Sequence, residues 1–343
     1  MSVFISGASG FIAQHIVENL LKENYTVIGS VRSQEKADRL TRQFGNNPNL
    51  QFEIVGDIAK LDAFDNAFSK HGKDIKYVLH TASPFHFNTT EYEKDLLIPA
   101  LNGTKGILES IKKYAADSVE RVVITSSFAA VSNVEYQGDS SKTLSEADWN
   151  TVSWEGAQAN GVFAYCGSKA FAERAAWDFL KENEGMVKFQ LSTVNPVLVF
   201  GPQLFEEDVK DTLNTSCEII NQTLHLPADA KIGPEINGNY IDVRDVAKAH
   251  MYAFQKENTI GQRLLMSNGY FGKQDIINVL NKNFPQLQGN IPPSNSETDI
   301  ASGKGRCVLD NSNTRAILNF SFKNLEQTVT DTVAQILEMK NDI

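Results

Sequence analysis

The sequence predicts an α/β protein: a Rossmann-type, doubly wound parallel sheet with a smaller C-terminal α/β substrate lobe. Three observations support this fold class. Short apolar runs alternate with segments of helical periodicity, a glycine turn follows the first run, and small or polar residues end most of the runs. Strands that alternate with helices form right-handed parallel crossovers, and ligands of such sheets bind beyond the carboxyl ends of the strands.

The first strand leads into a tight turn and a helix. Residues 3–5 are apolar, the spacing Gly7-x-x-Gly10-x-x-Ala13 follows at once, and apolar residues recur at helical spacing over 12–21. Gly7 permits the turn, Gly10 lets a pyrophosphate approach the backbone, and Ala13 allows the helix to pack on the sheet. The helix N-terminus offers N–H groups and a positive dipole end to phosphate. The alternative is an ordinary strand–helix turn.

The second strand, 26–32, ends in a cation. Arg32 closes the strand and Lys36 follows one turn later, with no carboxylate between Tyr25 and Gln34. A site that prefers NAD usually carries Asp or Glu there to bond the ribose 2′-hydroxyl. Two cations suit a 2′-phosphate, because a guanidinium can bind phosphate in a bidentate way. We therefore predict NADPH/NADP+ as the cofactor; the alternative is that both cations are ordinary solvated charges.

Four further strands complete the predicted sheet, at residues 52–58, 77–84, 121–127 and 189–202. Asp57, near the end of the first of these, could accept a hydrogen bond from an adenine amino group. Ser127 ends the third. Because these positions share one edge with the glycine turn and Arg32, the sequence predicts a binding site at that edge.

The run Tyr165-Cys166-Gly167-Ser168-Lys169 places a phenol and an ammonium four residues apart, on one face of a helix. A phenol titrates at about pH 10 in water, and a neighbouring ammonium lowers that pKa. Tyr165 could then exchange a proton with a substrate oxygen near neutral pH, and Ser127 could hydrogen-bond the same oxygen. Taken alone, the spacing is also consistent with a packed tyrosine and a solvated lysine. The nucleotide site upstream favours the chemical interpretation.

Together these motifs resemble those of the extended short-chain dehydrogenases/reductases. The resemblance rests on the glycine turn, Asp57, residues 80–83, 125–127, Tyr165 with Lys169, Asn195-Pro196 and 240–250. Within that family the chain is similar to the dihydroflavonol-reductase-like branch and, more narrowly, to the fungal NADPH-dependent methylglyoxal and 3-methylbutanal reductases, over nearly its whole length. The resemblance implies NADPH-dependent reduction of aldehydes and ketones, aryl ketones included, with hydride from nicotinamide C4.

The resemblance also implies a role for each matching residue. Tyr165 would be the general acid, Lys169 would lower its pKa and bond the nicotinamide ribose, and Ser127 would position the carbonyl. Asn102 falls where relatives carry an asparagine that helps to relay protons, although a buried asparagine bonded to backbone is an equally good interpretation. The expected cofactor-binding residues are Gly7, Ala8, Ser9, Gly10, Phe11, Ile12, Arg32, Lys36, Asp57, Ile58, Thr81, Ala82, Ser83, Tyr165, Lys169, Pro196, Val199 and Ser216.

The chain is expected to divide into two lobes with the substrate pocket between them. Residues 1–200 would form the NADPH-binding domain, 239–265 would return to it as a strand and a helix, and 201–343 would be mainly the substrate lobe. That lobe should contain helices over 209–224 and 324–339. The polar segment 133–161 is expected to fold over the active site. Candidate pocket walls, each equally explicable as core packing, are Phe85, Phe128, Tyr136, Val162, Phe163, Val199, Phe200 and Asn214.

Composition and charge limit the partners, metal sites and cellular location to be expected. The 343-residue chain has a net charge of −10 and no basic stripe, which argues against nucleic acid and acidic membrane surfaces as partners. Cys166, Cys217 and Cys307 lack paired spacing, so we expect free thiols in a reducing compartment. The histidines lack metal-ligand spacing, so no metal is expected, and no apolar run approaches membrane-spanning length. A first strand at the very start leaves no room for a signal peptide, so a cytoplasmic protein is expected, either monomer or dimer.

Two other functions remain open from the residues alone. A nucleotide-sugar epimerase or dehydratase would use the same scaffold, but it would keep NAD bound and need polar, basic surroundings; Arg32 and the apolar pocket argue against it. A redox-sensing binding protein without turnover tends to lose the catalytic tyrosine, whereas this chain retains Tyr165. The sequence therefore favours a carbonyl reductase that acts on small-molecule substrates.

Overall fold

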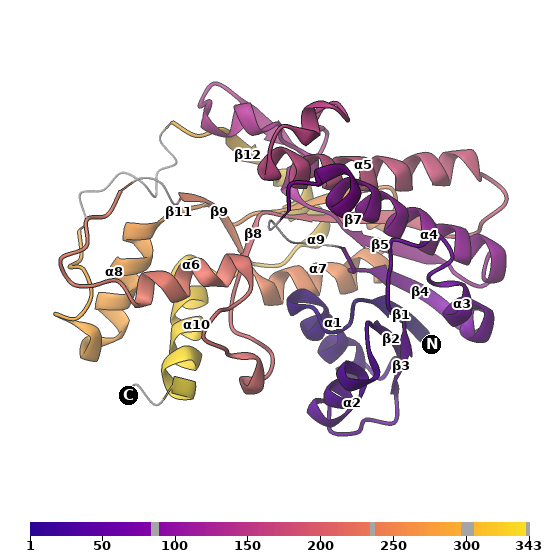
Figure 1. Cartoon of the computed structure of the whole chain (residues 1–343), viewed down its shortest axis with the longest axis horizontal. Helices are drawn as coiled ribbons and strands as arrows, with labels where there is room; N and C mark the ends of the chain where they lie inside the picture. Colours follow the sequence, from indigo (N-terminus) through magenta and orange to yellow (C-terminus); the bar gives the residue numbers. More distant parts are fainter. Residues whose placement is uncertain (84–88, 234–236, 296–304, 341–343) are drawn as a thin grey trace.

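A seven-stranded sheet forms the centre of the computed structural model, which describes residues 1–83, 89–233, 237–295 and 305–340. All of its pairings are parallel, and the strand order is β10-β7-β5-β4-β1-β2-β3 (Figure 1). The order reverses direction between β1 and β4, so the predicted doubly wound fold is confirmed. The strands are β1 (Ser2–Ser6), β2 (Thr26–Val31), β3 (Leu50–Ile54), β4 (Ile75–His80), β5 (Arg121–Thr125), β7 (Gln190–Pro196) and β10 (Arg263–Met266).

Helices cover both faces of this sheet because its central strands are apolar on both sides. In β1, Val3 and Ile5 belong to one core cluster and Phe4 belongs to the other, as the two-residue period of a strand requires. The face with Val3 and Ile5 is covered by α1 (Phe11–Lys22), α2 (Gln34–Gln43) and α7 (Val243–Gln255). The face with Phe4 is covered by α3 (Asp65–His71), α4 (Ile98–Tyr114) and α5 (Gly161–Glu182). A π-helical turn, η1 (Glu93–Leu97), leads directly into α4.

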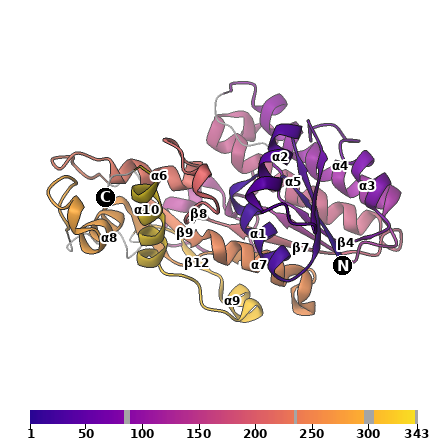
Figure 2. The same cartoon turned by 90° about the horizontal axis from the view of Figure 1, so that it is seen from below.

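A smaller lobe lies beside the parallel sheet and has its own core (Figures 1 and 2). Its sheet has the order β11-β9-β8, in which β8 and β9 are parallel and β9 and β11 antiparallel. This arrangement agrees with the predicted α/β substrate lobe. The strands and helices are β8 (Leu198–Phe200), β9 (Asn237–Asp242), β11 (Tyr270–Gly272), α6 (Thr215–Leu224), α8 (Lys273–Asn283) and α10 (Leu325–Lys340).

Two of the expected strands differ from the prediction. The single strand expected over 189–202 is two strands, β7 and β8, which belong to different sheets. The division follows Pro196, which has no N–H for a sheet ladder and is the last residue of β7 to pair with β10. The strand expected to return to the nucleotide-binding domain is β9, which pairs with β8 and β11 instead, so only α7 and β10 return to the large sheet.

The helix expected over 209–224 is shorter than predicted, and the C-terminal helix is confirmed as α10. Helix α6 begins only at Thr215 because the preceding segment folds back on it. The Leu213 N–H donates to a Glu218 carboxylate oxygen at 2.8 Å, and the Asn221 side chain donates to the Asp211 carbonyl at 2.9 Å.

The segment 133–161 is joined to the C-terminal part of the chain by a two-stranded parallel sheet. Strand β6 (Thr143–Ser145) pairs there with β12 (Val308–Asp310), and α9 (Ser312–Leu318) follows. Short 3₁₀ turns in the described residues are η2 (Phe128–Ala130), η3 (Val134–Gly138), η4 (Gly156–Gln158), η5 (Glu206–Asp208), η6 (Glu257–Thr259) and η7 (Pro285–Leu287).

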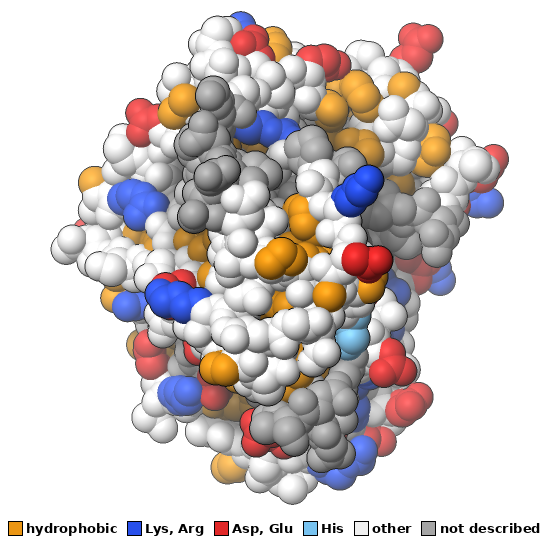
Figure 3. Space-filling view, turned by 90° about the vertical axis from the view of Figure 1, so that its left-hand side faces the viewer, with side chains coloured by type: hydrophobic (Ala, Val, Ile, Leu, Met, Phe, Trp, Pro, Cys, Tyr) orange, Lys and Arg blue, Asp and Glu red, His pale blue; other side chains and the backbone are white. Residues whose placement is uncertain are grey.

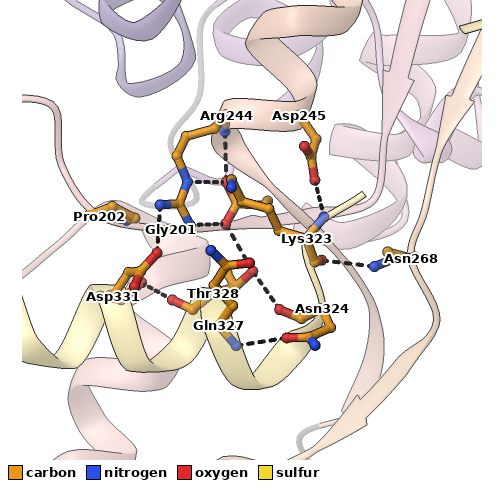
Figure 4. Close-up of polar contacts among 12 residues, drawn as sticks. Gly201, Pro202, Arg244, Asp245, Asn268, Lys323, Asn324, Gln327, Thr328 and Asp331 are labelled. Carbon is orange, nitrogen blue, oxygen red and sulfur yellow. Dashed lines mark hydrogen bonds and ion pairs between the residues drawn. The ribbon is translucent and has the colours of Figure 1, made fainter. Parts of the chain in front are cut away.

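An arginine network fastens α10 to the junction of β9 and α7 (Figure 4). Arg244 forms ion pairs with Asp242 at 2.7 Å and Asp331 at 2.6 Å. The Thr328 hydroxyl, from α10, donates to the same Asp242 carboxylate at 2.9 Å. The contacts at the lobe junction thus include a fully buried carboxylate, since the Asp242 side chain is 0% exposed.

The end of the molecule formed by the small lobe carries charges of both signs. Figure 3 shows Lys and Arg side chains interspersed with Asp and Glu over this face, with hydrophobic side chains between them. Within the described ranges, no helix combines the length and the apolar character that crossing a bilayer requires.

Candidate active site

The turn between β1 and α1 is shaped to admit a phosphate. Gly7 has φ +67°, and a Cβ atom there would lie 3.0 Å from the Ala82 Cα atom, so both backbone conformation and space require glycine. Gly10 is the N-cap of α1, and no described side chain caps this helix end. Helix N–H groups left without a side-chain acceptor bind anions. The turn thus fits the pyrophosphate of a dinucleotide.

The cations predicted for the 2′-phosphate lie beside this turn. Arg32 directly follows β2 and Lys36 lies in the first turn of α2, and both side chains are exposed. The Ser33 hydroxyl accepts the Lys36 N–H at 3.4 Å and so begins α2 between them. The two cations lie beyond the carboxyl end of β2, where the adenosine half of a dinucleotide binds in this fold.

The residues after β3 are arranged by α4. Asp57 lies beyond the end of β3, is exposed, and accepts the Ala59 N–H at 2.9 Å. Ile58 is buried in the core beneath α4. Asn102, from α4, donates to the Ala59 carbonyl at 3.0 Å. The backbone bond that was the alternative for Asn102 is therefore present, and its part in a proton relay stays a prediction.

A serine hydroxyl organises the end of β4. Ser6 accepts the N–H groups of Thr81 and Ala82 at 3.0 Å each, and its oxygen lies 2.8 Å from His80 Nδ1. Burial, and next the positive charge of Lys169, lower the pKa of His80 to about 3. The imidazole is thus neutral. Because the Ser6 oxygen already accepts two N–H groups, its own proton is free to be donated to Nδ1. These bonds hold residues 81–82 against Gly7.

Ser127, Tyr165 and Lys169 come together at the end of β5. The Ser127 hydroxyl lies 3.4 Å from the Tyr165 hydroxyl, and Lys169 Nζ lies 5.9 Å from the centre of the Tyr165 ring. Tyr165 and Lys169 are on one face of α5, whose N-cap Asn160 accepts the N–H groups of Val162 and Phe163. The predicted juxtaposition of the serine, the phenol and the ammonium is present.

Burial dominates the electrostatics of these groups. It raises the pKa of Tyr165 above the usual value for a phenol, and the hydrogen bond with Ser127 offsets only part of that rise. It also lowers the pKa of Lys169 to about 8. Burial therefore sets the direction of the shift at Tyr165, and the expected lowering of its pKa by Lys169 stays a prediction. Near neutral pH, Tyr165 is a protonated acid.

A buried carboxylate that the sequence reasoning missed lies behind these groups. Glu173 is on α5 at 1% exposure and accepts a hydrogen bond from Asn195 at 2.6 Å and one from the Ser126 hydroxyl. It pairs with Arg263 at 2.5 Å. The spacing Tyr165-x-x-x-Lys169-x-x-x-Glu173 extends one helix face by another turn, which was the available signal.

Two of the predicted pocket residues line a hollow beside α5. Tyr136 and Phe163 line a hollow of about 330 Å³ together with Asn133, Val134, Glu135 and residues 150–152, between the 133–161 segment and α5. Val162 is exposed, and Phe128 lies half-buried just after Ser127.

Other candidates are distributed over both lobes. Pro196 ends β7, and Val199 and Phe200 are buried in core clusters. Asn214 accepts a hydrogen bond from Gln203 at 3.1 Å, and Ser216 lies in the first turn of α6. Phe85 falls outside the described residues. Nowhere in the described part of the chain do three or more His, Cys, Asp or Glu side chains cluster as metal ligands would.

Comparison with known proteins places the whole chain in one family. Residues 3–266 match the model of the NAD dependent epimerase/dehydratase family. The chain is 60% identical over 343 residues to the NADPH-dependent methylglyoxal reductase of Saccharomyces cerevisiae, with 100% of each chain covered. It is 45% identical over 340 residues to a putative NADPH-dependent methylglyoxal reductase of Candida albicans, with 98% of each covered.

A solved structure extends the comparison to three dimensions. The crystal structure of the yeast methylglyoxal/isovaleraldehyde reductase complexed with NADPH superposes with a TM-score of 0.96, at 59% identity and with 100% of both chains covered. The predicted resemblance to the extended short-chain dehydrogenases/reductases is thereby confirmed.

Proposed function

The chain belongs to the NAD dependent epimerase/dehydratase family, and we propose that within it the protein is an NADPH-dependent carbonyl reductase. The observation that carries this proposal is the 3.4 Å approach of the Ser127 hydroxyl to the Tyr165 hydroxyl at the end of β5. Two hydroxyls at this separation can both reach one carbonyl oxygen. The 60% identity to a methylglyoxal reductase supports the same reaction.

The proposed reaction converts an aldehyde or ketone to an alcohol. Bound NADPH supplies the hydride that the carbonyl carbon receives. Ser127 donates a hydrogen bond to the carbonyl oxygen and stabilises the negative charge that develops there. Tyr165 transfers its proton to that oxygen, which completes the alcohol and leaves a phenolate. The raised pKa of Tyr165 keeps the phenol protonated before this step.

Lys169 has two tasks in this scheme. Its ammonium, 5.9 Å from the centre of the Tyr165 ring, stabilises the phenolate that forms as the proton leaves. It is also proposed to bond the ribose next to the nicotinamide, which is the role that the resemblance to the family implies. Asn102 is proposed to assist the return of a proton to Tyr165.

The remaining predicted residues are proposed to hold the cofactor. The turn over Gly7–Ile12 binds the pyrophosphate, Arg32 and Lys36 bind the 2′-phosphate, and Asp57 and Ile58 hold the adenine. Residues 81–83 run beside the cofactor, Pro196 and Val199 line the nicotinamide carboxamide, and Ser216 lies near the phosphates or the edge of the substrate lobe. Support comes from the cradle at Gly7, which a side chain would fill, and from the exposed cations after β2.

We propose small hydrophobic carbonyls as substrates, with 3-methylbutanal and methylglyoxal as the first candidates and aryl ketones after them. Phe128, Tyr136, Val162, Phe163, Asn214 and Phe85 stay predicted contacts of the substrate. A cytoplasmic location, suggested by three free cysteines, is part of the same proposal.

Absorbance at 340 nm tests the proposal directly. Purified protein is mixed with NADPH or NADH and each carbonyl, and cofactor oxidation is followed. Oxidation of NADPH that depends on the carbonyl, and is much slower with NADH, is the expected result. If neither NADPH nor NADH is oxidised with any of the carbonyls, the reductase assignment is overturned. NAD recovered from the denatured protein would then favour an epimerase or dehydratase.

A further inference from the structure

Glu173 continues the helix face that carries the proposed reacting groups. Residues 165, 169 and 173 are each four positions apart on α5, so Tyr165, Lys169 and Glu173 lie in one row along the helix. Glu173 is a charged side chain at 1% exposure. Nothing in the proposed reaction uses its charge, and a buried carboxylate needs donors around it to be tolerated. The residues that donate to the Glu173 carboxylate are therefore the residues whose positions it can fix.

Two of the donors to Glu173 are connected to Ser127. The Ser126 hydroxyl donates to Glu173 Oε2, and Asn195 Nδ2 donates to the same oxygen at 2.6 Å. Asn195 Nδ2 also donates to the Ser127 carbonyl at 3.2 Å. Ser127 is thereby held through its neighbour's side chain and through its own carbonyl. The helix that carries Tyr165 and the strand end that carries Ser127 meet at one carboxylate.

Arg263 supplies the counter-charge and binds the turn after Ser127. Its Nε donates to Glu173 Oε1 at 2.5 Å. Its other nitrogens donate to the carbonyls of Glu146 at 2.8 Å, Asp148 at 2.5 Å and Ala130 at 3.3 Å. The guanidinium carbon lies 3.8 Å from the centre of the Trp149 ring. The arginine thus joins β10, the 146–149 segment and the turn that follows Ser127.

A gain in folding stability does not by itself explain why Glu173 and Arg263 are buried as an ion pair. Two charges lose their hydration on burial, and well-packed apolar residues in the same space are often as stable. A fixed, fully bonded pair does specify geometry, and small displacements at a reacting site cost rate. The distance that matters here is the one between the hydroxyls of Ser127 and Tyr165.

We propose that Glu173, with Arg263 as its counter-ion, is a positioning residue that fixes Ser127 against Tyr165. This inference rests on the proposed reductase function. Loss of the Glu173 charge should lower kcat, because the hydrogen bonds of Glu173 connect to Ser127 at the end of β5. It should have little effect on the dissociation constant of NADPH, because none of these bonds, within the described residues, connects to the glycine turn.

A double-mutant cycle tests this assignment with NADPH and 3-methylbutanal. Glu173→Gln keeps the size of the side chain and removes its charge. We expect Glu173→Gln to lower kcat by about tenfold or more in the wild-type background and by less than about twofold in a Ser127→Ala background, since residues that act as a unit are non-additive. The dissociation constant of NADPH, from cofactor fluorescence, should stay within about twofold of wild type in both.

A matched control separates positioning from general support. Trp177 donates from Nε1 to Glu173 Oε1 at 3.3 Å, and none of the bonds from its indole leads to Ser127 in the part of the chain that the structure describes. Trp177→Phe should therefore leave kcat unchanged. If Glu173→Gln does not fold, Ser126→Ala, which removes one bond and no charge, should lower kcat less, again only where Ser127 is present.

Three results would overturn the inference. One is an unchanged kcat in both Glu173→Gln and Ser126→Ala; another is the same fold-loss with and without Ser127; a third is an equal loss in Trp177→Phe. A wild-type protein that does not oxidise NADPH with any carbonyl would instead remove the proposed function itself, so the two failures are distinguishable.

Discussion

The arginine–carboxylate network at the end of β5 and the one at the lobe junction have different surroundings. At the end of β5, Arg263 pairs with Glu173, and the carboxylate also accepts a bond from Ser126. At the lobe junction, Arg244 pairs with Asp242 and Asp331. Glu173 and Asp242 are both 0% exposed at the side chain, but Arg263 is 9% exposed and Arg244 is 29%.

The difference lies in what each buried carboxylate joins. Glu173 connects a helix to the strand end beside Tyr165, whereas Asp242 connects the start of α7 to the Thr328 hydroxyl of α10. The same chemistry can thus position two reacting hydroxyls or hold two lobes together. We expect variants of the first network to lose turnover, and variants of the second to lose stability.

The largest effect should come from the reacting end of the first network. Tyr165→Phe keeps the ring and removes the proton donor, so we expect kcat to fall by about 10²–10⁴-fold, the usual contribution of a general acid. NADPH binding, measured by fluorescence, should stay near that of wild type. A variant that turns over at nearly the wild-type rate would remove Tyr165 from the mechanism.

Breaking the second network should change stability instead. Arg244→Met leaves Asp242 as a buried carboxylate without its ion pair, so the free energy of unfolding should fall by about 3–5 kcal/mol. Urea unfolding measures this loss, and kcat is measured at a temperature where the variant is folded. Lys22→Ala, which breaks an exposed pair with Glu18, is the control and should change stability by less than about 1 kcal/mol. A loss of kcat in folded Arg244→Met would contradict the division of roles.

Cofactor preference depends on neither network. Removal of Arg32 takes away charge-assisted hydrogen bonds to the 2′-phosphate, each worth about 1.5–3 kcal/mol. Arg32→Ala should therefore raise the KM for NADPH by roughly 10- to 150-fold and leave the KM for NADH unchanged. An unaltered ratio of the two constants would show that the 2′-phosphate is bound elsewhere.

The last prediction concerns the pH dependence of turnover. Burial lowers the pKa of Lys169 to about 8, so its ammonium is lost as the pH rises through about 8. If that charge assists Tyr165, kcat/KM for NADPH should be level below this pH and fall about tenfold per pH unit above it. A level profile up to pH 10 in protein that remains folded would show that the charge of Lys169 is not needed.

The site at the strand ends could be predicted from the sequence, but the two ion-pair networks could not. The glycine turn, Arg32 and the Tyr165–Lys169 spacing are local patterns, so the site at the strand ends could be predicted from them. The bond between Glu173 and Arg263 joins residues 90 positions apart, and no periodicity of either segment indicates it. Such pairs depend on the tertiary fold alone.

The boundaries of the strands also could not be predicted from local sequence patterns. The apolar run through 189–202 is continuous in sequence, yet its two halves pair with different partners, β10 on one side of Pro196 and β9 on the other. Likewise, the burial that raises the pKa of Tyr165 comes from the packing of α5 and the β5 end, which the spacing of Tyr165 and Lys169 does not reveal.

The most direct test of this account is kcat for carbonyl-dependent NADPH oxidation by two variants, Glu173→Gln and Arg244→Met, measured side by side at a temperature where both are folded. The account predicts a loss of about tenfold or more for Glu173→Gln and a rate near that of wild type for Arg244→Met. Equal losses in the two variants, or a loss only in Arg244→Met, would contradict it.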